Sequence, residues 1–134
     1  MTEPPTVSVV IPMHDAEQWI LETLTSIDAQ THPVLECIVV NDGSTDDGPD
    51  LVLGFAATSG LAVRMIDGPC TGVAAARNRG IAAARGDLVA LMDADDLWHP
   101  DKVLHQVRHL DDTGASVSIS GFEMFPGGRD GVRW

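Results

Sequence analysis

Short apolar runs alternate with amphipathic stretches along the whole chain. Residues 7–11, 35–40, 61–66, 88–92 and 115–120 carry closely spaced Val, Ile and Leu, which predicts five β-strands. The stretches between them have the spacing or composition of helices. Such alternation predicts the α/β class: a mostly parallel sheet with right-handed crossovers and helices on both faces.

Individual residues indicate where the first elements end and begin. Pro12 is expected to end the first strand because it has no N–H to donate to a ladder. Asp15 is expected to cap the helix that follows. The buried face of that helix is expected to comprise Ile20, Leu24 and Ile27. The next helix is expected over residues 46–57, although its glycines and proline weaken the pattern.

The second half of the chain shows the same kind of signals. An alanine-rich helix is predicted over residues 73–85, with Gly86 as its C-cap. Residues 88–92 are nearly all apolar, so that strand is expected to be buried on both faces. Pro100 is expected to start the last helix, and residues 126–131 are expected to be coil. The apolar face of the last helix comprises Val103, Val107 and Leu110.

Composition and charge narrow the class of protein. The length of 134 residues and the 44% apolar content fit a single globular domain over residues 1–134. A net charge of −12 argues against nucleic-acid binding; it suits divalent cations, or serves solubility alone. Without a signal peptide or a membrane-length apolar run, a cytoplasmic location is expected, with peripheral membrane association left open. Cys37 and Cys70 are interpreted as reduced, structural thiols.

The sequence Asp-Ala-Asp-Asp at 93–96 follows the apolar strand and is the sharpest chemical signal. Three carboxylates in four residues repel one another unless a cation lies among them, and oxygen ligands suit Mg²⁺ or Mn²⁺. Such a metal stabilises the charge on a departing diphosphate. The alternative is a solvated acidic turn that caps the next helix.

Weaker signals lie at other positions. Asp42, in the turn Asn-Asp-Gly-Ser at 41–44, is placed to accept hydrogen bonds from a base or ribose, unless the turn is an ordinary β-turn. Arg77 is placed to reach diphosphate oxygens, or belongs to a solvated helix face. His14 is either a nucleotide contact or incidental. Trp19 and Trp98 are interpreted as packing residues rather than stacking platforms.

Several familiar sites are absent from the sequence. The G-x-G-x-x-G of a dinucleotide fold, the P-loop and the G-x-S-x-G elbow of hydrolases do not occur. Leu97 stands where aspartyl-phosphate phosphatases carry Thr or Val. The single lysine, Lys102, is predicted on a helix rather than on the late strand of a receiver domain.

Four segments together resemble family 2 glycosyltransferases of the GT-A fold. Residues 9–17 resemble the family's opening strand and Pro-x-Tyr-Asn-x-Glu motif, and residues 38–46 its nucleotide-binding strand and turn. Residues 72–81 are similar to its G-x-(A/S)-x-A-R-N-x-G helix. Residues 86–102 resemble the strand that leads into the D-x-D metal motif. The segments keep their order and spacing over roughly residues 7–121, which makes the combination specific.

The resemblance implies transfer of a sugar from a nucleoside-diphosphate sugar, with UDP as the expected nucleotide, to an unknown glycan, lipid or protein acceptor. It places Asp42 at the base, Asp93 near the ribose and Asp95 on an Mn²⁺ or Mg²⁺ ion. The expected nucleotide-sugar contacts are Pro12, His14, Glu17, Asp42, Arg77, Asp93 and Ala94. The expected metal ligands are Asp95, Asp93 and Asp96.

The chain also departs from the family. His14 and Asp15 replace the usual Tyr-Asn pair, which leaves base stacking open. Family members continue into an acceptor part with a general base, whereas only Glu123 and Asp130 follow Gly121 here, outside any base motif. We therefore expect a GT-A fold shortened on its C-terminal side that binds nucleotide but transfers sugar poorly or not at all. It is expected either to form a homo-oligomer or to lack a C-terminal part.

Two alternative functions are considered. A non-catalytic nucleotide- or partner-binding module is the main alternative. A nucleotidyltransferase would require a basic glycine-rich loop that residues 13–16 do not provide.

Overall fold

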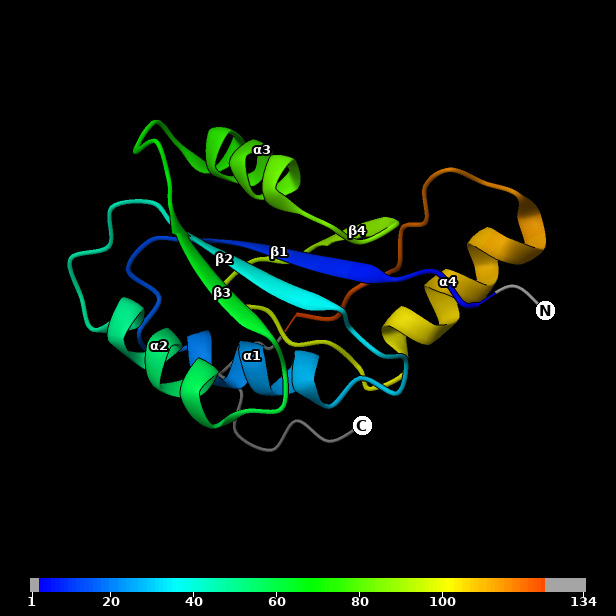
Figure 1. The fold of residues 1–134 in the computed structure, drawn as a ribbon, viewed down its shortest axis with the longest axis horizontal. Coiled ribbons are helices and arrows are strands. Elements are labelled where there is room, and N and C mark those ends of the chain that lie inside the picture. The colour runs from blue at the N-terminus through cyan, green and yellow to red at the C-terminus, as the bar shows by residue number, and fades with distance from the viewer. Residues whose placement is uncertain (1–2, 125–134) are drawn as a thin grey trace.

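The computed structural model describes residues 3–124, which form one sheet with helices packed on both faces (Figure 1). The four strands are all parallel and lie in the order β3-β2-β1-β4. In chain order the elements are β1 (Val7–Met13), α1 (Ile20–Asp28), β2 (Glu36–Asn41), α2 (Gly48–Thr58), β3 (Val63–Asp67), α3 (Val73–Ala83), β4 (Leu88–Leu91) and α4 (Lys102–Thr113). The predicted α/β class and parallel sheet are therefore confirmed. The predicted end of the first strand at Pro12 is wrong: β1 continues to Met13, because β4 pairs only with residues 7–10 and Pro12 lies beyond that ladder.

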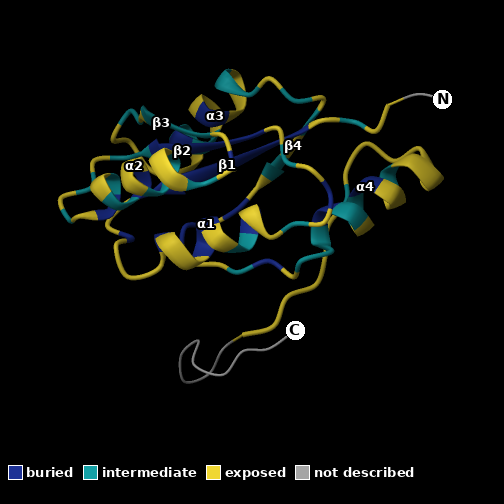
Figure 2. Ribbon diagram, turned by 60° about the horizontal axis from the view of Figure 1, so that its bottom comes forward, coloured by how far each residue is buried: buried dark blue, intermediate teal, exposed yellow. Residues whose placement is uncertain are grey.

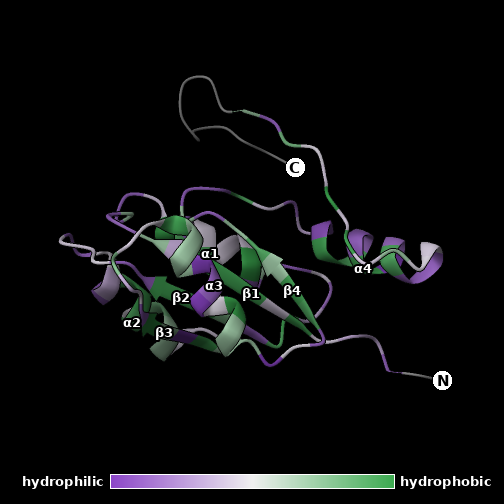
Figure 3. Cartoon of the chain, turned by 90° about the horizontal axis from the view of Figure 1, so that it is seen from above, coloured by the Kyte–Doolittle hydropathy of each residue, from purple (hydrophilic) through white to green (hydrophobic). Residues whose placement is uncertain are grey.

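The sheet separates two apolar clusters, because successive side chains of a strand point to opposite faces. Val9 and Ile11 of β1 pack with the inner faces of α1, α2 and α4, and Val10 packs on the other face with Ala76 of α3. β1 and β2 are consequently buried on both sides (Figure 2), and much of both strands has the green of hydrophobic residues in Figure 3. A side chain at Gly80 would overlap Val10, so the close contact of α3 with β1 requires glycine there.

The predicted cap of the first helix is wrong. α1 begins at Ile20, its N-cap is Trp19, and no side chain caps it. Asp15 lies earlier, with a left-handed φ of 48°, and its carboxylate accepts a hydrogen bond from the Thr45 N–H at 2.7 Å. The Asp15 carboxylate, which the local sequence assigned to the helix, is instead used in a contact between two loops. The predicted buried face of Ile20, Leu24 and Ile27 is confirmed.

Two predictions about the segment around β4 are also wrong. α3 ends at Ala83 with the extended residue Ala84 as its C-cap, whereas Gly86 lies against β1 and donates its N–H to Ser8 Oγ at 2.8 Å. β4 is not buried on both faces, because it is the edge strand of the described sheet. Its residues Val89 and Leu91 are 40% and 50% exposed.

The last helix and the segment after it differ from expectation as well. α4 begins at Lys102 instead of Pro100, although Val103 and Val107 are buried as predicted. Residues 115–120 form no strand, and the side chains of Val117 and Ile119 are 70% and 90% exposed. The coil predicted for 126–131 lies outside the described residues. Within residues 3–124, no helix has the length and apolarity that crossing a membrane requires.

A buried carboxylate ties the amino ends of the strands together. Glu36 of β2 is 1% exposed and accepts hydrogen bonds from Ser8, Arg64 and Arg85. Arg64 also donates to the carbonyl of Ala83, at the end of α3, at 2.6 Å. Burial alone would raise the pKa of Glu36, but the donors, with Arg85 foremost, outweigh it and lower the pKa to about 2. This cluster holds α3 in place at the amino ends of the strands, opposite the pocket described next.

Candidate functional site

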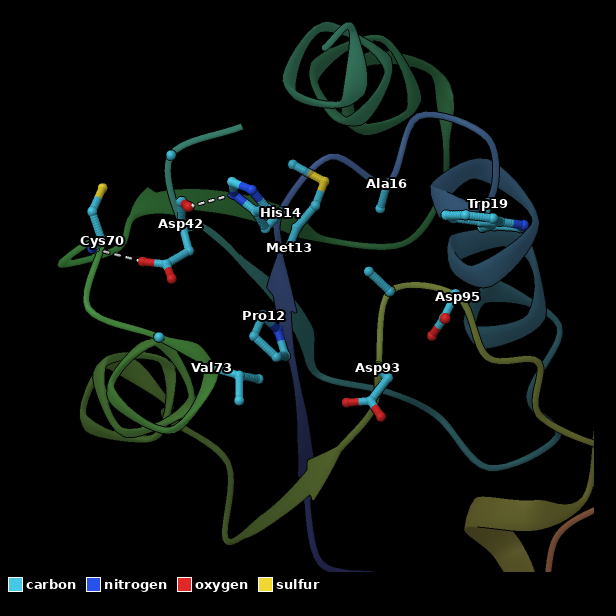
Figure 4. Close-up of a pocket in the computed structure, with 13 residues that line it drawn as sticks. Pro12, Met13, His14, Ala16, Trp19, Asp42, Cys70, Val73, Asp93 and Asp95 are labelled. Atoms are coloured by element: carbon cyan, nitrogen blue, oxygen red, sulfur yellow. Dashed lines mark hydrogen bonds between the residues drawn. The ribbon is translucent and has the colours of Figure 1, made fainter. Parts of the chain in front are cut away.

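A pocket of about 620 Å³ opens at the carboxyl ends of β1, β2 and β4 (Figure 4). The chain passes outward from β1 to β2 and β3, then crosses to the other side of β1 to form β4. Ligands of open α/β sheets bind at such a reversal of strand order. The pocket is lined by Pro12, Met13, His14, Ala16, Trp19, Asp42, Gly43, Cys70, Gly72, Val73, Asp93, Ala94 and Asp95.

Asp42 is held in place by three neighbours. Its N–H donates to the Met13 carbonyl at 2.8 Å, and its own carbonyl lies 2.9 Å from His14 Nδ1. Because a carbonyl only accepts, Nδ1 is the protonated nitrogen in this contact. The Asp42 Oδ1 atom accepts the N–H of Cys70 at 2.7 Å. These contacts fix the carboxylate at the end of β2 beside the pocket.

The loop between β1 and α1 is joined to the loop between β2 and α2 by reciprocal hydrogen bonds. Asp15 accepts the N–H of Thr45; this bond is the main cause of the lowered pKa of Asp15, a fall that slight desolvation opposes. The Glu17 N–H donates to Asp46, and the Glu17 carboxylate accepts the N–H of Asp47 at 3.1 Å. Glu17 therefore holds the N-terminus of α2 and is not among the residues that line the pocket.

The acidic turn after β4 brings three carboxylates together. Oxygens of Asp93, Asp95 and Asp96 lie within 4.8 Å of one another, and all three residues are exposed. The buried hydroxyl of Thr23, on α1, lies 3.0 Å from the Ala94 carbonyl and 2.8 Å from the Asp96 carbonyl. This contact anchors the turn to the core, so the carboxylates project from a fixed backbone.

Arg77 of α3 is the cation beside this turn. Its Nη2 atom lies 2.5 Å from Asp93 Oδ1, and both side chains are partly exposed. The guanidinium offsets part of the repulsion among the three carboxylates. Arg77 does not itself line the pocket, and neither does Asp96, although both adjoin pocket residues.

The donor set of the turn fits a hard divalent cation. Three carboxylates supply only oxygen atoms, which Mg²⁺ and Mn²⁺ prefer, and they lie close enough together to share one ion. Asp93 and Asp95 also line the pocket, so an ion held by them would lie at its wall.

Most of the residues singled out in the sequence meet in this one pocket: Pro12, His14, Asp42, Asp93, Ala94 and Asp95. Trp98 is 7% exposed and packs in the core as expected, but Trp19 is 38% exposed and lines the pocket. Sequence reasoning also missed Cys70, which was interpreted as structural and is exposed here. Its position in a Gly-Pro-Cys turn just after β3 was the available signal, since that turn must share the carboxyl edge of the sheet.

The sequence comparison agrees with this geometry. Residues 8–134 match the family model described as glycosyl transferase family 2. The chain belongs to this family. A protein of Rickettsia felis named "Uncharacterized glycosyltransferase" is 33% identical over 117 residues, which are 87% of this chain and 19% of that protein.

Solved structures show the same fold. A mannosyltransferase of Pyrobaculum calidifontis, in complex with GDP-Man and Mn²⁺, is 34% identical with a TM-score of 0.77 over 84% of this chain. TarS of S. aureus, in complex with UDP-GlcNAc, is 25% identical with a TM-score of 0.73 over 81% of it. The fold is therefore GT-A, and the family 2 chain is a glycosyltransferase by resemblance. It spans about a third of each of these two structures.

Proposed function

We propose that the chain forms the donor-binding part of a metal-dependent glycosyltransferase that uses a nucleoside-diphosphate sugar, with UDP as the nucleotide. The observation that carries the proposal is the meeting of Asp42 with Asp93 and Asp95 around one pocket at the reversal of strand order. A volume of about 620 Å³ is in the range of small-molecule sites. The solved relatives named above hold UDP-GlcNAc or GDP-Man.

Each end of the pocket has its own chemistry. Asp42, between His14 and Cys70, is assigned to the base. Pro12 supplies an apolar wall, and Asp93 is assigned to the ribose. Glu17 supports the base end indirectly, because it holds the loop that carries Asp42 against the loop that carries His14.

Asp95, with Asp93 and Asp96, is assigned to an Mn²⁺ or Mg²⁺ ion. When bound, the ion neutralises charge on the diphosphate as it departs from the sugar. Arg77 keeps Asp93 oriented toward the pocket wall, and its guanidinium lies close enough to add a positive charge beside the phosphates.

The catalytic base is left unassigned. Among the described residues after α4, Glu123 is the one carboxylate; it does not line the pocket that holds Asp42 and Asp95, but lines an adjoining hollow together with Asp95 and Asp96. We therefore propose that the 134-residue chain binds the donor but transfers sugar slowly or not at all. A binding module without catalysis is the second candidate. Slow, metal-dependent hydrolysis of a UDP-sugar by the purified chain would separate the two.

We propose the partners and the location from the charge and the exposed surface of the chain. The acceptor is a glycan, a lipid or a protein; nucleic acid is excluded from the proposal because the net charge is −12. A cytoplasmic location, with contact at the membrane surface for a lipid acceptor, fits the need for a nucleotide-sugar donor. The exposed edge strand β4 makes a second copy of the chain a further expected partner.

Calorimetric titration of UDP with and without Mn²⁺ tests the proposal. Binding that needs Mn²⁺ and is lost in Asp95→Ala is expected. Asp112→Ala is the matched control, because Asp112 is also exposed but lies at the far end of α4. Equal UDP binding by Asp95→Ala and the parent chain would remove the metal from the proposal, and absence of binding in both would remove the donor site.

A further inference from the structure

Trp19 has the largest side chain that lines the pocket, and the donor site proposed above assigns it no role. It stands directly before α1, as the N-cap residue of that helix. The next residue, Ile20, is fully buried, as is Leu24, whereas Trp19 is 38% exposed. An aromatic ring left this open retains apolar area that a ligand in the pocket can cover.

The backbone of Trp19 is linked to the acidic turn through Thr23. The Trp19 carbonyl accepts the N–H of Thr23 at 3.0 Å. The hydroxyl of Thr23 in turn donates toward the carbonyls of Ala94 and Asp96, at 3.0 and 2.8 Å. Thr23 therefore holds the start of α1 and the acidic turn in a fixed relation, so the indole ring has a defined place beside the carboxylates.

The two ends of the pocket differ in their side chains. Figure 4 shows the Trp19 ring edge-on above Asp95, at the end of the pocket away from Asp42 and Cys70. In a nucleoside-diphosphate sugar the base and the sugar lie at opposite ends, with the diphosphate between them. With the base at Asp42 and the metal-bound diphosphate at Asp95, the sugar extends toward the end of the pocket where Trp19 lies.

We propose that Trp19 is a binding residue for the transferred sugar, whose pyranose ring stacks on the indole ring. The inference rests on the donor site proposed above. A pyranose carries C–H groups on its faces, which form apolar surface that packs against a flat aromatic ring, while its hydroxyl groups project from the edge. UDP alone has no such ring. The contact therefore contributes to binding of the sugar and not to binding of the nucleotide.

Calorimetric titrations of UDP and of UDP-sugars, all with Mn²⁺, test this role. UDP-glucose, UDP-galactose and UDP-N-acetylglucosamine are compared because the donor sugar is unknown, and the one that binds most tightly is the probe. Trp19→Ala is expected to weaken the probe by about three- to tenfold and UDP by less than about twofold. Trp19→Phe keeps a ring and is expected to keep most of the affinity. Leu21→Ala is the matched control, because Leu21 is 39% exposed on α1 but does not line the pocket; both its affinities are expected to stay unchanged.

Tryptophan fluorescence gives a second readout, which a purely structural role would not move. The UDP-sugar is expected to change the emission of the parent chain more than UDP does, and Trp19→Phe is expected to abolish that difference. Equal weakening of UDP and the UDP-sugar by Trp19→Ala, or no weakening of either, would overturn the inference and leave the donor site standing. A parent chain that binds UDP but none of the UDP-sugars would do the same. A parent chain that binds no ligand at all would overturn both proposals.

Discussion

The guanidinium of Arg77 lies 2.5 Å from the carboxylate of Asp93, across the gap between α3 and the turn after β4. The two residues come from different predicted motifs, and their pairing places a cation at the acidic turn. Asp93 therefore has two competing partners, the arginine and a divalent ion.

Removal of Arg77 is expected to strengthen binding of Mn²⁺ by the nucleotide-free chain. Arg77→Gln leaves Asp93 without its guanidinium and removes a positive charge that repels the ion, so the affinity is expected to rise roughly three- to tenfold at low salt. Free Mn²⁺ followed by electron paramagnetic resonance measures the change. Arg79→Gln, on the same helix but bonded to the carbonyl of Asp67, is the control and is expected to change little. Unchanged or weaker binding by Arg77→Gln would contradict the assigned competition.

The carboxylate of Glu36 is expected to make stability depend on acid. Its pKa is lowered from 4.5 to about 2 in the folded chain, so its contribution is complete above about pH 4.5 and is lost as pH falls toward 2. Glu36→Gln is expected to cost on the order of 3 kcal/mol at neutral pH and to flatten this acid dependence. Urea unfolding at pH 7 and pH 3 measures both effects. Glu3→Gln, at an exposed position, is the control; equal acid dependence in all three chains would rule out the role of Glu36.

Two glycine-to-alanine changes are expected to shift the free energy of unfolding in opposite directions. Gly80→Ala places a methyl group against Val10 and is expected to destabilise the fold by about 1–3 kcal/mol. Gly54→Ala, inside α2, meets nothing within 4 Å and is expected to stabilise by about 0.5–1 kcal/mol through helix propensity. Thermal and urea unfolding of both variants measure the difference. Stabilisation by Gly80→Ala would mean that α3 does not pack closely on β1.

The exposed edge of the sheet is expected to drive self-association. Val89 and Leu91 of β4 are 40% and 50% exposed, and β4 pairs with only one neighbour in the described sheet. Sedimentation velocity is expected to show concentration-dependent association that Leu91→Lys reduces. Leu53→Lys, at a leucine of α2 that is 54% exposed, is the control. A monodisperse monomer with a sharp, high thermal transition would contradict this prediction.

The sequence predicted those features that depend on local pattern and on parallel topology. The apolar runs identified the four described strands, and the carboxyl ends of parallel strands share one edge. Asp42 and Asp93 were therefore expected to meet although 51 positions separate them (93 − 42). The buried face of α1 followed from the spacing of Ile20, Leu24 and Ile27.

What the sequence did not predict depends on contacts between distant segments. Asp15 and Glu17 have the residue types of a helix cap and a ligand contact, yet both bind backbone N–H groups about 30 positions away. The exposure of Leu91 depends on which strand lies beside β4, and an apolar run carries no information about its neighbours. The Cys70 contact is made by backbone, so no side-chain pattern marks it.

Mapping of the ligand site by nuclear magnetic resonance tests the central claim most directly, because it reports each amide of the chain separately. With UDP and Mg²⁺, the amide signals of Asp42, Gly43, Cys70 and Gly72 are expected to shift, and Mn²⁺ is expected to broaden those of residues 93–96 first. Signals of Glu36, Arg64 and Arg85, at the opposite edge of the sheet, are expected to stay unchanged. Shifts centred on that opposite edge, or no response at the carboxyl edge, would contradict the assignment of the pocket as the donor site.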